Sequence, residues 1–275
     1  MKNSITYTIA KSLFIIITLT ITSCNGVPEE TSETATLEEK AFSVEEVLEM
    51  VSKENDVTRT LYTKAIVGKG KVQGMKFDED WRKDKVEAGP LPALFLRGVS
   101  NSIQKGPVPL GLYLGSDFPV NNANKFVGKQ AKLFEKIKEN EEPQFFYDDS
   151  QNLHTAMFAD LASANACVTC HNQHPQTAKT DWKLGDVMGA TTWQYPKDSL
   201  SYKDAIAVLN AYSKGTVDTY VEYLNEIAAF TESEKPVIGK KWPEEGNYLP
   251  TAEVFLDSVR KLSSYETMKT LVAKN

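Results

Sequence analysis

One pentad, Cys167-Val168-Thr169-Cys170-His171, gathers the most reactive side chains of this chain. The whole sequence has three cysteines and three histidines, and the pentad holds two of the cysteines and one of the histidines. Any fold must therefore present two thiols and an imidazole from one short segment. C-x-x-C-H is the attachment motif of a c-type haem, in which the thiols form thioethers and the imidazole binds iron. The pattern predicts one covalent haem c, with Cys167 and Cys170 as tethers and His171 as proximal iron ligand.

Two other kinds of site use similar residues. Cys167, Cys170, His171 and His174 would make a Cys2His2 zinc set, but the adjacent Cys170 and His171 rarely reach one tetrahedral ion together. The two cysteines would also make a redox dithiol, which normally opens a helix after a strand and a turn. The sequence shows no such strand–turn–helix pattern around Cys167, so we favour haem.

Residues 1 to 23 have the pattern of a secretory signal peptide. Lys2 and Lys11 supply its positive charge, and an apolar run from 13 to 21 is short for a membrane span. The run ends in Ile-Thr-Ser before Cys24, which resembles a bacterial lipobox. We therefore expect Cys24 to be lipidated and to anchor the protein outside the cytoplasm on a bacterial membrane, in the periplasm or at the outer membrane. The alternative is an uncleaved anchor helix in which Cys24 is incidental.

The charge balance is acidic, with a formal net charge of −6 that becomes more negative once Lys2 and Lys11 are removed. Nucleic-acid binding needs basic patches, so we expect no nucleic-acid partner. Residues 24–42 are polar and predict a flexible tether. We expect a haem-binding domain over 43–197 and a helical extension over 198–275.

Hydrophobic periodicity predicts a mixed, α+β fold. Ser43 and Glu46 form a capping-box pattern for a long N-terminal helix, which the glycine-rich stretch 68–74 should break. The pattern over 144–159 predicts a hairpin. The expected helices cover 44–67, 93–104, about 126–137, 198–230 and 252–262, and the expected strands cover 109–118, 144–147, 153–159 and 187–195. Such strands predict an antiparallel sheet flanked by helices.

Five motifs occur in an order typical of one family. They are Arg59-Thr60-Leu61-Tyr62, Pro90-Leu91-Pro92-Ala93, Ser116-Asp117-Phe118-Pro119, CVTCHNQHP from Cys167, and KTDWKLGDV from Lys179. Over roughly residues 45 to 200 the chain resembles the PAS-like extracytoplasmic sensor domain that carries a c-type haem in bacterial sensor kinases, cyclases and stand-alone proteins. The resemblance implies a PAS-like sheet and haem-based sensing of redox state or of a small gaseous ligand.

The chain departs from that family in two ways. Arg97 stands where many relatives have a histidine soon after the Pro-Leu-Pro-Ala motif, and no cysteine is free to act as an axial ligand. We expect no kinase or cyclase to follow the domain, so any signal would pass to a separate redox or signalling protein.

The sixth iron ligand has only weak candidates. His154 and Met75 are the two that we name, with Met188 as a further thioether; the ordinary roles of these residues are a surface histidine and core methionines. His174 suits a supporting or propionate-binding role better than ligation across the haem. Arg97, Lys179 and Lys183 are candidate propionate partners or plain solvated charges. Trp182 and Trp193 are expected to pack against the haem segment.

Two functions follow from these features. The first is a haem-based sensor of redox state or of a gas, and the alternative is an electron-transfer cytochrome. We do not expect an enzyme, because no acid–base set is recognisable in the sequence, although an open haem can reduce small molecules.

Overall fold

The computed structural model describes residues 41–243 and 246–273, with side chains as far as residue 263. The predicted signal peptide, Cys24 and most of the predicted tether lie outside these residues. The helices are α2 (Val44–Leu61), the π-helical η1 (Tyr62–Gly68), α3 (Lys69–Val72), α4 (Pro92–Gln104), the 3-10 turn η2 (Asn122–Asn124), α5 (Gly128–Asn140), α6 (Asn165–Gln173), α7 (Tyr202–Ala228) and α8 (Ala252–Ala273). The strands are β1 (Ala41–Ser43), β2 (Phe77–Asp78), β3 (Gly89–Pro90), β4 (Gly111–Gly115), β5 (Gln144–Asp148), β6 (Leu153–Leu161), β7 (Val187–Tyr195), β8 (Ser199–Ser201), β9 (Ile238–Gly239) and β10 (Leu249–Pro250).

The main sheet has four antiparallel strands in the order β4-β7-β6-β5. The predicted hairpin is present as β5 and β6, and strand β7 has the predicted bounds. The prediction of an α+β fold with an antiparallel sheet flanked by helices is confirmed.

The N-terminal helix starts as predicted but does not end where predicted. Ser43 and Glu46 form the capping box, with the Ser43 N–H donating to Glu46 Oε2 over 2.8 Å. The chain stays helical through η1 and α3, so the prediction of a break at residues 68–74 was wrong for most of that stretch. The stop comes at Gly74, which has a φ of 90°. Gly74 N–H donates to Lys71 O and Met75 N–H donates to Gly70 O, which is a Schellman motif.

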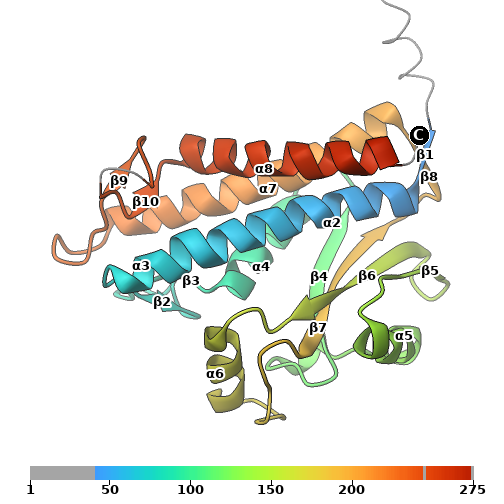
Figure 1. The fold of residues 1–275 in the computed structure, drawn as a ribbon, viewed down its shortest axis with the longest axis horizontal. Helices are drawn as coiled ribbons and strands as arrows, with labels where there is room; N and C mark the ends of the chain where they lie inside the picture. The colour runs from blue at the N-terminus through green and yellow to red at the C-terminus, as the bar shows by residue number, and fades with distance from the viewer. Residues whose placement is uncertain (1–40, 244–245, 274–275) are drawn as a thin grey trace, which may run out of the picture.

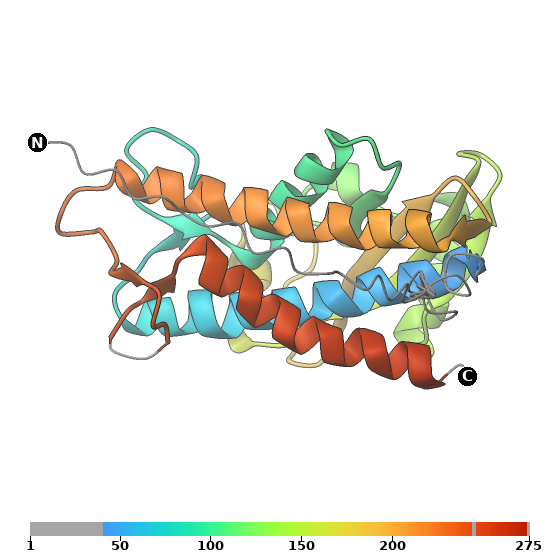
Figure 2. The same ribbon diagram turned by 90° about the horizontal axis from the view of Figure 1, so that it is seen from above.

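Helices cover both faces of the sheet. The α5 helix packs on one face through Phe134 and Ile137, against Met157 of β6. The opposite face packs against α2 and α4 in the main core, which α7 and α8 also enter. Figures 1 and 2 show α7 and α8 running beside α2 as a helical layer above the sheet. None of the described helices is long and apolar enough to cross a membrane.

Three smaller expectations need correction. The end of the predicted tether is structured, because β1 pairs with β8 and Phe42 is buried. The last helix extends well beyond residue 262; Ser263 is buried and its hydroxyl donates to the Val259 carbonyl within the helix. Trp193 does not pack against the haem segment, since it lies in the main core with its ring edge-on to Tyr212 at 5.7 Å.

Candidate functional site

The CVTCH pentad lies on α6, a short helix that follows the end of β6 and projects below the sheet (Figure 1). Cys167 and His171 are four residues apart and therefore share one face of the helix. Both are half-buried, whereas Cys170 is exposed. Cys167 and Val168 pack against a small apolar cluster of Ala162, Trp182 and Met188. The helix thus presents two thiols and one imidazole next to this apolar cluster.

The loop after α6 is fastened back onto the helix. The Asn172 amide donates to the Trp182 carbonyl over 3.0 Å, and the Trp182 N–H donates to Asn172 Oδ1 over 2.9 Å. Asp186 continues the connection, because its carbonyl accepts the Ala162 N–H. Gly185 has a φ of 90°, a conformation that favours glycine. The KTDWKLGDV motif therefore holds the attachment helix in place.

The His171 imidazole is suited to binding iron. Burial is the largest influence on its pKa and lowers it, His174 lowers it further, and the charge of Asp160 opposes both. A lowered pKa keeps the ring neutral near pH 7, which ligation requires. Among the described residues, none makes a hydrogen bond to the His171 ring, so both nitrogens are available.

The reason given against a redox dithiol was wrong, but other evidence disfavours that site. The cysteines do follow a strand and a turn, on helix α6. Reactive dithiols lower a thiol pKa at a helix N-terminus. Here desolvation, helped by Glu79 and opposed by Lys71, raises the pKa of the Cys170 thiol. A raised pKa lowers the thiolate fraction of Cys170, and a reactive dithiol depends on thiolate.

His174 is already engaged on both ring nitrogens. Its Nδ1 accepts the Gln176 N–H over 3.1 Å, so its Nε2 carries the proton and donates to Glu79 Oε2 over 3.3 Å. Both ring nitrogens of His174 therefore already have hydrogen-bond partners. No group of three or more His, Cys, Asp or Glu side chains in the described part of the chain is placed to hold a metal ion. The zinc alternative therefore lacks its fourth ligand.

The structure does not bring His154 to the attachment helix. His154 pairs with Tyr195 at the start of β6, whereas Leu161 pairs with Val187 at the end that leads to α6. At about 3.3 Å per residue, the strand from His154 to Leu161 spans roughly 23 Å. His154 is therefore not a distal ligand for iron held by His171.

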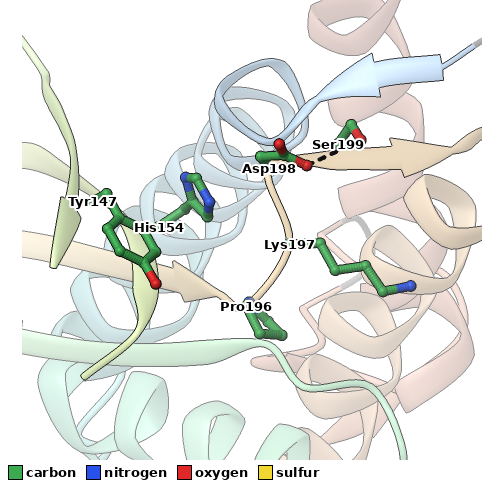
Figure 3. Close-up of a pocket in the computed structure, with 6 residues that line it drawn as sticks. All are labelled: Tyr147, His154, Pro196, Lys197, Asp198 and Ser199. Carbon is green, nitrogen blue, oxygen red and sulfur yellow. Dashed lines mark hydrogen bonds between the residues drawn. The ribbon is translucent and has the colours of Figure 1, made fainter. Parts of the chain in front are cut away.

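His154 instead lines an open hollow of about 540 Å³ at the other end of the sheet (Figure 3). Its ring lies 4.9 Å from that of Tyr147. Pro196, Lys197 and Asp198 line the hollow with Ser199, whose hydroxyl donates to Asp198 Oδ1 over 3.2 Å. This hollow is remote from the pentad and forms no part of the candidate site.

The two methionine candidates lie in different places. Met75 follows α3, and a Cβ added to Gly70 would meet its Sδ at 3.0 Å. Met75 packs against the main core, four residues before Glu79, whose carboxylate contacts His174. Met188 is buried against Trp182 in the cluster beside Cys167.

The basic candidates differ in their surroundings. Lys179 lies 4.7 Å from the Trp182 ring centroid and pairs with Asp181. Lys183 and Arg97 are exposed, and Arg97 lies on α4. Trp182 packs on the attachment helix as predicted, and its Nε1–H is buried without a hydrogen-bond partner.

Sequence reasoning missed one part of the site, an ion pair at the end of β6. Arg59 Nη2 donates to Asp160 Oδ1 over 2.7 Å, and Arg59 Nη1 donates to Thr191 Oγ1 over 3.2 Å. Tyr62, the other end of the Arg-x-x-Tyr motif, donates its hydroxyl to the Pro90 carbonyl over 2.7 Å. The motif was visible in the sequence, but the partners of Arg59 lie 101 and 132 residues away, where no local pattern points to them.

Comparison with known proteins gives one match. A family model described as Tll0287-like matches residues 29–196, which include the Arg-x-x-Tyr motif, α6 and β7. No curated protein and no solved structure matches the chain. At the family level this match supports an extracytoplasmic haem-binding domain of the sensor type. Because the matched residues make up more than half of the sequence, the chain belongs to the Tll0287-like family.

Proposed function

We propose that this protein is a c-type haem protein, anchored outside the cytoplasm by lipid on Cys24, that senses redox state or a small gaseous ligand. The observation that carries the proposal is the arrangement on α6. The helix presents two free thiols and the His171 imidazole, whose pKa is lowered, and it packs against the apolar cluster of Ala162, Trp182 and Met188. Haem bound there supplies one-electron redox chemistry and an iron that small gases can bind.

The residues of the site fit a haem in three respects. Cys167 and Cys170 would tether it and His171 would ligate it. Trp182 and Met188 offer apolar surface next to Cys167, as a porphyrin requires. The buried Trp182 Nε1–H lacks an acceptor, and a propionate is one group that would satisfy it.

Covalent attachment is tested by replacing both cysteines. We expect the chain, produced with a c-type maturation system, to keep haem staining on a denaturing gel. Cys167→Ala together with Cys170→Ala should abolish that staining. Trp193→Phe, a change in the remote core, is the matched control and should retain it. Staining that survives in the double-cysteine variant would overturn the proposal.

A sensor is favoured over the alternative, an electron-transfer cytochrome, because the described residues place no strong sixth ligand at the site. His174 is engaged on both nitrogens and His154 is remote, which leaves the two methionines, Met188 beside Cys167 and Met75 at the edge of the main core. The exposed Cys170 is the feature that suits electron transfer, since a haem edge near it would be open to a partner.

The visible spectrum separates the two functions. We expect the reduced protein to shift its Soret band under carbon monoxide, because the sixth position is open or weakly held. A low-spin spectrum that ignores carbon monoxide in the native chain and becomes responsive in Met75→Leu would instead assign Met75 as a firm ligand and favour electron transfer.

A further inference from the structure

The ion pair between Arg59 and Asp160 lies where β6 meets the attachment helix. Side chains alternate along a strand. Ala156 and Phe158 of β6 point into the main core beneath α2, and Asp160 is next on that face. Arg59 on α2 donates a hydrogen bond to Asp160 through Nη2. Its Nη1 donates a second one to Thr191 Oγ1 of β7. Three elements, α2, β6 and β7, thus meet at the Arg59 guanidinium.

The pairing of β6 with β7 is irregular beside this carboxylate. Asp160 pairs with Gly189 and Leu161 pairs with Val187, so the register skips Met188 of β7, as in a β-bulge. Bulges re-aim side chains and often occur beside active sites. Ala162 follows at once and packs in the cluster that contacts Cys167. Asp160 is therefore the next-to-last residue of β6, just before the segment that carries the pentad.

The cluster contains two carboxylates, Asp56 and Asp160, and one guanidinium, Arg59. Asp56 on α2 interacts with Arg59 as well, so two carboxylates share one guanidinium. Only Leu161 separates Asp160 from Ala162, and Ala162 packs in the cluster that contacts Cys167, so Asp160 lies close to the segment that would tether the haem.

We propose that Asp160, held in place by Arg59, puts a negative charge beside the haem-attachment segment and lowers the reduction potential of the haem iron. The inference rests on the proposed haem function and extends it. Ferric iron carries one more positive charge than ferrous iron, so a nearby carboxylate stabilises the oxidised state. Groups beside a ligating histidine commonly tune the metal in this way.

The test compares variants of opposite charge change in the haem-loaded protein. Asp160→Asn keeps the shape of the side chain and removes the negative charge, so we expect the midpoint potential to rise. Arg59→Gln removes the positive charge, so the potential should fall. Glu135→Gln on α5 removes an exposed carboxylate on the opposite face of the sheet and should leave the potential unchanged, because solvent screens distant charges.

The opposite signs separate an electrostatic role from a structural one. If both variants at the ion pair moved the potential in the same direction, or if Asp160→Asn matched Glu135→Gln, the inference would be overturned. Arg59→Lys keeps the charge and should stay close to the native potential. Haem staining of each variant is read first. Haem that attaches without the expected shifts refutes only this inference, whereas absence of covalent haem from the native chain refutes the proposed function.

Discussion

At the scale of single residues, Asn172 connects the attachment helix to the loop that follows it. Its amide makes two hydrogen bonds to the Trp182 backbone, and both of those backbone groups have no other partner recorded in the described structure. Asn172→Ala should cost about 1–3 kcal/mol in the free energy of unfolding, because it leaves a partly buried N–H and C=O unpaired. Urea denaturation measures this loss. Asn101→Ala, at an exposed position on α4, is the control. Equal midpoints for the two variants would contradict the assignment.

At the scale of elements, the end of the N-terminal helix is decided by one glycine. Gly74 has a φ of 90° and open space around its Cα, so a substitution there meets backbone strain and no clash. Gly74→Ala should destabilise the protein by about 1–2 kcal/mol, since a left-handed conformation costs a residue with a Cβ that much. Thermal unfolding is the measurement. The neighbouring exposed Gln73→Ala provides the control and should have little effect; a similar loss in both variants would argue against the strain.

The elements that sequence reasoning predicted well have strong local signals. The capping box of Ser43 and Glu46 fixes the start of α2, and the turn sequence Asp-Asp-Ser-Gln-Asn marks the β5–β6 hairpin. The signals that misled were local as well. Gly70 does not break the helix; its missing Cβ makes room for Met75 and Phe77, a contact that exists only after the chain folds back.

The site shows the same division between local and distant information. Cys167, Cys170 and His171 could be predicted as site residues because the whole motif lies in five consecutive residues. His154 was wrong as a ligand because strand direction, which the sequence does not state, carries it away from α6. Asp160 was missed because its significance depends on Arg59 from another element.

At the scale of the whole molecule, the C-terminal helices share the core of the family domain. Phe255 of α8 packs edge-on to Tyr62 at 6.5 Å, and Tyr212 of α7 contacts Trp193. The matched family region ends at residue 196, before both helices. A chain lacking residues 202–275 would expose the apolar side of α2 and α4 to water. We expect this fragment to unfold in urea without cooperativity and to bind a hydrophobic dye. The full chain should unfold cooperatively and should not bind the dye.

A substitution in the full chain tests the same dependence without truncation. Helices α4 and α7 approach closely at Gly98, where an added Cβ would lie 2.4 Å from Thr219 Cγ2. Gly98→Ala should therefore destabilise the protein by about 1–3 kcal/mol through overpacking. Adding Thr219→Ala removes the clashing methyl and should restore part of that loss. A fragment that unfolds at the midpoint of the full chain, together with a neutral Gly98→Ala, would show that residues 198–275 are a separate extension.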